Sequence, residues 1–203
     1  MYDFDEIIDR RHTNAMNTDG FRDYIFHADE SMVFPYKDEE FIRMWVADMD
    51  FPSPPEVSEA IVRRAQHGTY GYTEATDEDF ASIAGYWQRH HGLTLDKPDV
   101  VMLPCVITGL RMGVRTLTQP GDGVILQPPV YGPFFRAIEE NGRRVMENPL
   151  IQNGNRWEMD FPGLEKCMQQ GAKLLLLCSP HNPAGRAWRE AELARVVELC
   201  AKY

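Results

Sequence analysis

Lys173-Leu-Leu-Leu-Leu-Cys-Ser-Pro-His-Asn-Pro-Ala-Gly185 joins an apolar run to a rigid polar loop. The run from Leu174 to Cys178 is typical of a strand that is buried on both faces. Two prolines restrict the loop that follows, and Gly185 permits a tight turn. Asn182 lies between the prolines, so its amide is expected to hold a fixed direction and to donate to a ligand oxygen. An ordinary Asn-Pro turn is the alternative interpretation.

Short apolar segments alternate with amphipathic segments from about residue 99 onward. The apolar segments predict strands, and apolar residues at helical spacing predict helices. This alternation is typical of an α/β domain whose mostly parallel sheet is covered by helices on both sides. The expected strands are 99–103, 124–126, 144–147 and 173–178, and the expected helices are 5–11, 55–67, 77–91, 107–117, 131–141, 161–169 and 188–202.

Ligands of such sheets bind beyond the carboxyl ends of the strands. Three segments are expected there: 104–107, 127–132 and 179–185. The first turns directly into a helix, whose free N–H groups attract an anion such as phosphate. An ordinary strand–helix connection is the alternative. In the second, two prolines precede Tyr131, whose ring can stack on a planar ligand or can simply cap the core.

Composition and charge exclude several classes of function. The 203 residues include 21 Lys and Arg against 31 Asp and Glu, a formal net charge of −10. This charge argues against nucleic acid and membrane surfaces as partners. The acidic N-terminus lacks the features of a signal peptide, and no apolar run is long enough to span a bilayer. The cysteines show no metal-ligand spacing, so we expect reduced thiols, no metal site and a cytoplasmic protein.

Five stretches together resemble the fold-type I pyridoxal-phosphate enzymes of the class I/II aminotransferase superfamily. More narrowly, they resemble the cystathionine β-lyase branch typified by MalY and PatB. They occur in the order found in that family, from about residue 40 to the end of the chain. They are Met44-Trp-Val-Ala-Asp-Met-Asp-Phe-Pro52, Gly71-Tyr-Thr73, Gln127-Pro-Pro-Val-Tyr-Gly-Pro-Phe134, Asn148-Pro-Leu150 and Pro180-His-Asn-Pro-Ala-Gly185.

The resemblance implies a fold and an activity. Residues 1–54 are expected to form an N-terminal arm and small-domain segment. Residues 55–203 are expected to form the first part of a three-layer α/β/α PLP-transferase-like large domain, incomplete at its C-terminus. The implied activity is that of a carbon–sulfur β-lyase, which uses pyridoxal 5′-phosphate to cleave cystathionine or cysteine S-conjugates to pyruvate, ammonia and a thiol. A homodimer with sites at its interface is implied as well.

The resemblance also assigns roles to individual residues. Val106 and Ile107 match positions whose backbone holds the cofactor phosphate. Tyr131 matches the ring that stacks on the pyridine. Asn182 matches the amide that contacts the phenolic oxygen of the cofactor and helps to place the substrate carboxylate. Tyr72 matches a tyrosine that reaches the phosphate of the neighbouring subunit.

The resemblance assigns one further role, and the sequence departs from the family pattern at several positions. Ala47 matches a backbone position near the substrate carboxylate. Cys105 stands where the family usually has glycine, and residues 14–40 do not match the usual opening of the family. The Schiff-base lysine of the family is expected beyond Tyr203, so no catalytic residue is assigned here and the 203 residues alone are expected to be inactive.

Two other functions remain open at this point. An aminotransferase of the same superfamily shares the early steps of the reaction. A non-catalytic or regulatory truncated homologue would keep the fold without the chemistry.

Overall fold

The computed structural model describes residues 2–29 and 31–203. The chain divides into two compact units, Met1–Ala75 and Thr76–Tyr203, each of which is described by itself. The expected division between residues 54 and 55 concerns domains of the family and stays a prediction. Within the described residues, no helix is both long and apolar enough to cross a membrane.

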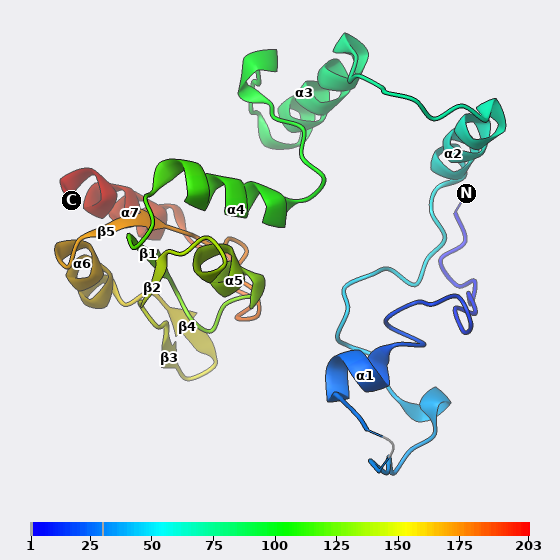
Figure 1. Ribbon diagram of the computed structural model, residues 1–203, viewed down its shortest axis with the longest axis horizontal. Helices are drawn as coiled ribbons and strands as arrows, with labels where there is room; N and C mark the ends of the chain where they lie inside the picture. Colours follow the sequence, from blue (N-terminus) through cyan, green and yellow to red (C-terminus); the bar gives the residue numbers. More distant parts are fainter. Residues whose placement is uncertain (1, 30) are drawn as a thin grey trace. The chain divides into compact units, whose positions relative to one another are not determined.

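The second unit is built on a three-stranded parallel sheet (Figure 1). Its strands are β1 (Gly123–Leu126), β2 (Arg144–Glu147) and β5 (Ala172–Leu175), in the order β2-β1-β5. All four residues of β1 are buried, as expected for a central strand with neighbours on both edges. The parallel sheet confirms the predicted α/β class.

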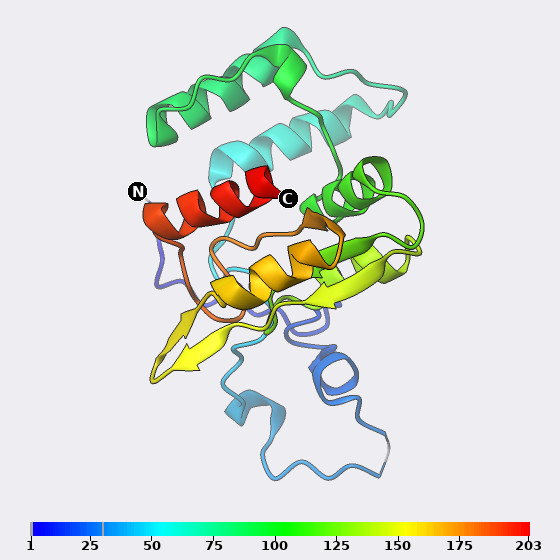
Figure 2. The same ribbon diagram turned by 90° about the vertical axis from the view of Figure 1, so that its left-hand side faces the viewer.

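Helices cover both faces of this sheet (Figure 2). Successive side chains of a strand point to opposite faces. Val124 and Leu126 therefore pack on the side of α4 (Val106–Leu117) and α5 (Pro133–Glu139). Ile125 packs on the other side, with α6 (Phe161–Gln169) and α7 (Glu190–Lys202). The result is the three-layer α/β/α arrangement that the sequence predicts.

The chain order creates a switch point beside β1. From β1 the chain passes through α5 to β2 on one edge, and it then returns through α6 to β5 on the opposite edge. The connections that leave β1 and β5 therefore diverge from a crevice at the carboxyl ends of these two strands. In open α/β sheets this crevice is where ligands bind.

Three helices, α2, α3 and α6, have the bounds that the sequence predicts, and α2 and α3 carry strong signals at both ends. α2 (Pro55–His67) begins with proline in its first turn and ends at Gly68, which has φ of 74°. α3 (Asp77–His91) is capped by the Thr76 side chain and ends at Gly92, which has φ of 64°. A left-handed residue after a helix favours glycine.

Two expectations about local structure were wrong, and one element was not predicted. Residues 5–11 are not helical, since the Asp9 carboxylate accepts the backbone N–H of Arg11 in a local turn that competes with a helix. Residues 99–103 are not a strand, because no neighbouring strand supplies their hydrogen bonds in the described chain. The sequence also gave no warning of a hairpin formed by β3 (Ile151–Asn153) and β4 (Arg156–Glu158).

The first unit contains two short helices besides α2. They are α1 (Phe21–Phe26) and the 3-10 helix η1 (Asp38–Glu40). The buried ring of Phe21 lies 5.6 Å from Trp45 and 5.4 Å from Phe41, measured between ring centroids. Aromatic packing thus joins the segments before and after residue 30, a region that reads as polar and irregular in the sequence.

Candidate active site

The loops that follow β1 and β5 are tied together at the switch point. The imidazole of His181 lies with Nε2 2.9 Å from the carbonyl oxygen of Pro129. Val130, one residue after Pro129, and Pro183, two residues after His181, form an isolated antiparallel bridge. Because these contacts join positions that are about fifty residues apart in the chain, they fix the two loops against each other.

Tyr131 and Asn182 lie next to these contacts between the two loops. Each is the chain neighbour of a residue in the bridge, so the structure brings both to the carboxyl edge of the sheet. The Tyr131 ring is 46% exposed and the Asn182 residue is exposed, so both are accessible to a ligand. Tyr131 is therefore not the buried core tyrosine of the alternative interpretation.

Val106 and Ile107 are the first residues of α4. The other end of this helix lies beside the start of β2, because the Arg143 guanidinium donates to the Thr118 hydroxyl over 3.0 Å. The first turn of α4 is thus directed toward the carboxyl edge of the sheet. Its N–H groups receive no side-chain cap, since Cys105 makes no capping bond. An uncapped helix start of this kind suits an anion.

Cys105, the residue before this turn, has a thiol with an altered pKa. Its sulfur lies 3.4 Å from the hydroxyl oxygen of Thr108, and this hydrogen bond lowers the pKa of the Cys105 thiol below its usual value. The segment 104–107 was expected to leave a strand, and it instead follows an irregular stretch.

A buried polar chain supports the loop after β1. The Gln127 side-chain N–H donates to the Asn148 amide oxygen over 3.1 Å, and the Asn148 N–H donates to the Asp160 carbonyl over 3.0 Å. Gln127 and Asn148 are both 1% exposed. Sequence reasoning singled out Asn148 only as part of a family stretch and missed its partnership with Gln127. Buried polar residues at strand ends are the signal that would have found it.

Ala47 and Tyr72 belong to the first unit. Ala47 is exposed, and its neighbour Asp48 is held by an ion pair with Arg10 and by the Asn17 side-chain N–H over 3.1 Å. The bond from Arg10 holds the pKa of the Asp48 carboxyl below its usual value. The Tyr72 side chain is fully exposed. The roles expected for Ala47 and Tyr72 stay predictions.

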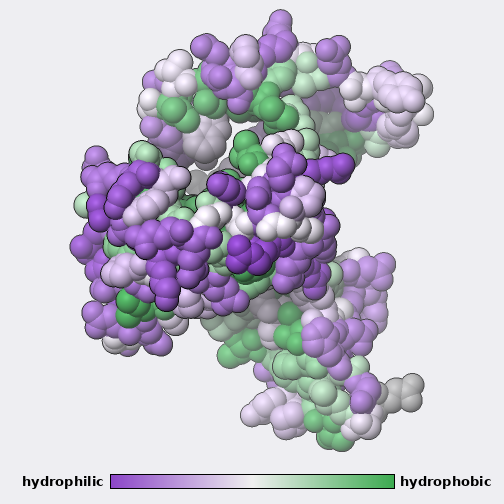
Figure 3. Space-filling model, turned by 60° about the vertical axis from the view of Figure 1, so that its left-hand side comes forward, coloured by the Kyte–Doolittle hydropathy of each residue, from purple (hydrophilic) through white to green (hydrophobic). Residues whose placement is uncertain are grey.

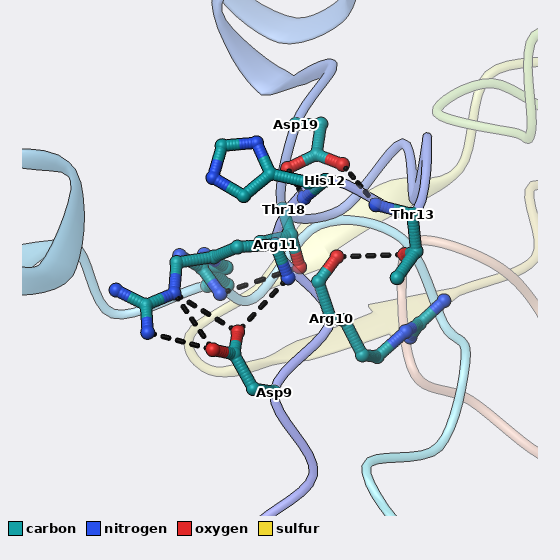
Figure 4. Close-up of polar contacts among 8 residues, drawn as sticks. Asp9, Arg10, Arg11, His12, Thr13, Thr18 and Asp19 are labelled. Carbon is teal, nitrogen blue, oxygen red and sulfur yellow. Dashed lines mark hydrogen bonds and ion pairs between the residues drawn. The ribbon is translucent and has the colours of Figure 1, made fainter.

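The N-terminal arm carries its own polar cluster (Figure 4). The Asp19 carboxylate accepts the backbone N–H groups of His12 and Thr13 over 3.1 and 3.0 Å. The Asp9 carboxylate pairs with the Arg11 guanidinium over 2.6 Å. Since these carboxylates are engaged by the arm itself, the cluster serves to fold the arm and we assign it no ligand.

Several expectations about reactive groups can be compared with the structure. All four cysteines are free thiols. Within the described residues, no group of three or more His, Cys, Asp or Glu side chains is arranged to hold a metal ion. The five lysines are Lys37, Lys97, Lys166, Lys173 and Lys202. Lys97 pairs with Asp77 and Lys202 pairs with Glu165, both on the surface.

The donor set at the carboxyl edge fits pyridoxal phosphate. The uncapped first turn of α4 supplies N–H donors for a phosphate. The exposed ring of Tyr131 offers a face for an aromatic heterocycle, and the Asn182 amide offers a donor for a phenolic or carboxylate oxygen. These groups lie around a switch point, which defines a ligand-binding α/β protein.

Comparison with known proteins identifies the family of this ligand-binding α/β chain. Residues 39–203 match the family of aminotransferases of class I and II, and the chain belongs to this family. It is 40% identical over 161 residues to cystathionine beta-lyase PatB of Bacillus subtilis, covering 79% of this chain and 42% of PatB. It is 33% identical over 205 residues to protein MalY of Escherichia coli, covering 100% of this chain and 50% of MalY.

A solved structure extends the comparison. The PLP-bound C-S lyase of Staphylococcus hominis superposes with a TM-score of 0.85 at 34% identity, covering 100% of this chain and 49% of that chain. The resemblance to the MalY/PatB branch is thereby confirmed. The chain spans about half the length of the curated relatives that it matches.

Proposed function

We propose that this chain is the N-terminal part of a pyridoxal-phosphate-dependent carbon–sulfur β-lyase that acts on cystathionine or cysteine S-conjugates. The observation that carries the proposal is the convergence of Tyr131 and Asn182 at the β1/β5 switch point. The likeness to PatB over 79% of the chain supports the choice of reaction. The expected products are pyruvate, ammonia and a thiol.

The proposal gives each residue at the carboxyl edge a binding role. The backbone N–H groups of Val106 and Ile107 would hold the cofactor phosphate, with the positive end of the α4 dipole behind them. The Tyr131 ring would lie against the pyridine. The Asn182 amide would donate to the phenolic oxygen and orient the substrate carboxylate. When bound, the cofactor supplies an electron sink that makes loss of the α-proton and of the thiol feasible.

Residues of the first unit would complete the substrate site. The backbone at Ala47 would face the substrate carboxylate, and the bonds that Asp48 makes to Arg10 and Asn17 would keep this segment in place. Tyr72 would reach the phosphate of a neighbouring subunit, so we propose a homodimer. Its fully exposed side chain is compatible with that role.

We do not propose any lysine of this chain as the residue that holds the cofactor covalently. Lys97 and Lys202 are engaged in surface ion pairs, and Lys166 and Lys173 are exposed on α6 and β5. We propose that the 203 residues alone do not catalyse the reaction. The four free thiols support a reducing compartment, so we place the protein in the cytoplasm.

Cystathionine is the substrate that tests the proposal. The full-length protein, loaded with pyridoxal phosphate, should release pyruvate from cystathionine without any added keto acid. A matched reaction with a keto acid measures transamination, which is the alternative activity within the family. Amino-group transfer to the keto acid without release of pyruvate would contradict the lyase and favour the aminotransferase.

A further inference from the structure

His181 stands between the two loops of the candidate site and has no role in the proposed chemistry. Its side chain is 1% exposed, which makes it one of the most completely buried polar groups described in the chain. Its ring packs edge-on against Trp188, with 5.5 Å between the ring centroids and 81° between the planes. The Trp188 indole N–H in turn donates to the Cys178 carbonyl over 2.8 Å. The ring is therefore held in one orientation from the side of α7.

The hydrogen bond of His181 defines the state of its ring. The carbonyl oxygen of Pro129 can only accept, so Nε2 must carry the proton that it receives. Nδ1 is buried and has no hydrogen-bond partner in the described chain. An unpartnered buried nitrogen detracts from folding stability. Stability alone consequently gives little reason for an imidazole at this position, because its one hydrogen bond is set against an unpaired buried nitrogen.

The loop that carries His181 is also closed on itself. The His181 backbone N–H donates to the Arg186 carbonyl over 2.8 Å, and the His181 carbonyl accepts the Gly185 N–H over 2.7 Å. Asn182 lies within this closed turn. The contacts that fix His181 therefore also fix Asn182. The hydrogen bond from His181 to Pro129 then fixes this turn relative to the loop that carries Tyr131.

We propose that His181 is a positioning residue, which ties the loop after β5 to the loop after β1 and so sets the spacing between Asn182 and Tyr131. The inference rests on the proposed function, since it assumes that both residues face one bound cofactor. It adds a residue that touches neither cofactor nor substrate and that acts through the backbone of Pro129. Because the proposed connection between the two loops is structural, it should be measurable without any catalytic turnover.

Two substitutions separate positioning from stability. His181→Phe keeps an aromatic ring beside Trp188, although a larger one, and it removes both the donor and the unpaired nitrogen. His181→Gln restores an N–H donor near the position of Nε2. Val196→Ala is the matched control, because Val196 is 5% exposed on α7 and is a member of neither loop nor of the contacts that join them. It should lower stability without disturbing the tie.

The full-length protein is first tested without cofactor. Hydrogen exchange of the amides in 127–132 and 181–186 should accelerate in His181→Phe and stay near the wild-type rate in His181→Gln. The melting temperature of His181→Phe should fall by no more than that of Val196→Ala, so that faster exchange in His181→Phe alone reflects the lost bond to Pro129 and not general stability. Unchanged exchange in His181→Phe would overturn the tie, whatever the cofactor does.

The second measurement uses cofactor titration. The apparent Kd of the apoenzyme for pyridoxal phosphate should rise about tenfold in His181→Phe, the effect expected for one hydrogen bond. The visible circular dichroism of the bound cofactor should weaken with it, and His181→Gln should restore both. Equal losses in Val196→Ala would show that the effect is general destabilisation, and would overturn the proposal. A wild-type protein that binds no pyridoxal phosphate would refute the proposed function, while hydrogen exchange would still decide whether His181 joins the loops.

Discussion

The Gln127 side chain donates to Asn148 over 3.1 Å in a site that excludes solvent from both amides. The direction of this bond is fixed by a third group. The Asp160 carbonyl can only accept, so Asn148 must direct its N–H toward it and its oxygen toward Gln127. The end of β1 is in this way attached to the start of α6, and the loop after β1 leaves from a rigid point.

Asn148→Ala should therefore destabilise the fold. The substitution leaves the Gln127 N–H and the Asp160 carbonyl without their partner in the interior, which should lower the free energy of unfolding by about 2–3 kcal/mol. Urea denaturation of the full-length protein, followed by circular dichroism, measures this change. Gln152→Ala, on the exposed strand β3, is the control and should change the midpoint little. Equal midpoints for the two variants would contradict the buried network.

Gly123 should resist substitution for a steric reason. A Cβ at this position would lie 2.2 Å from the Sδ of Met146 on the neighbouring strand. Since Met146 is buried, its side chain can move only by disturbing the core, and Gly123→Ala should cost about 1–3 kcal/mol of stability. Gly132→Ala is the matched control, because a Cβ there meets nothing within 4 Å. A thermal melt in which both variants behave alike would argue against the close approach of β1 and β2.

Tyr131 should contribute to cofactor binding through its ring and not through its hydroxyl. Tyr131→Ala removes the face proposed for the pyridine and should weaken binding of pyridoxal phosphate by about tenfold, whereas Tyr131→Phe should stay within about threefold of the wild type. Quenching of protein fluorescence during titration of the apoenzyme gives both constants. The stacking role would be wrong if Phe and Ala weakened binding equally.

The Cys105 thiol should be more acidic than the thiols of Cys167 and Cys200. The Thr108 hydroxyl lowers the pKa of Cys105, whereas burial raises the pKa of Cys200 and of Cys167. A thiolate forms as the pH rises through the thiol pKa, so alkylation of Cys105 should begin at a lower pH than alkylation of the other two. Iodoacetamide labelling over a pH series, read by peptide mass spectrometry, tests this order.

A substitution and a ligand sharpen the test on Cys105. Thr108→Val removes the hydroxyl and should move the onset of Cys105 labelling toward the pH of an ordinary thiol. Bound pyridoxal phosphate should slow the labelling, because the phosphate is proposed to lie at the same helix start. Labelling that is fastest at Cys200, or that the Thr108 variant leaves unchanged, would contradict the local hydrogen bond.

Much of the fold could be predicted because its signals are local. α2 and α3 have strong ends, Pro55 and Gly68 for the one and Thr76 and Gly92 for the other. The run of leucines before Ser179 predicted a strand, and β5 forms its beginning, but the strand ends at Leu175 and none of its four residues is buried as the prediction required. Strands and helices of this kind are determined by a few neighbouring residues, so a single sequence suffices to locate them.

The failures concern interactions over long distances in the chain. Residues 99–103 have the composition of a strand, yet a strand requires a partner, and Val101 and Met102 remain exposed without one. The aromatic packing of Phe21 with Trp45 and the bond from His181 to Pro129 join residues that no periodicity connects. For the same reason the candidate residues could be named from the sequence, but the tie that sets their spacing could not.

Apolar side chains remain exposed in the second unit as well as in the first. In Figure 3 they form separate patches with hydrophilic side chains between them. Val106 and Leu117, at the two ends of α4, are 79% and 68% exposed. α2 and α3 bury no residue at all among those described. Neither helix therefore contributes a buried residue to a core of the described chain.

The position of the bound cofactor tests the central claim most directly. A crystal structure of the full-length protein with pyridoxal phosphate should show the pyridine against Tyr131, the phosphate at the N–H groups of Val106 and Ile107, and the phenolic oxygen beside Asn182. Density for the cofactor at any place other than the carboxyl edge of β1 and β5 would contradict the site proposed here.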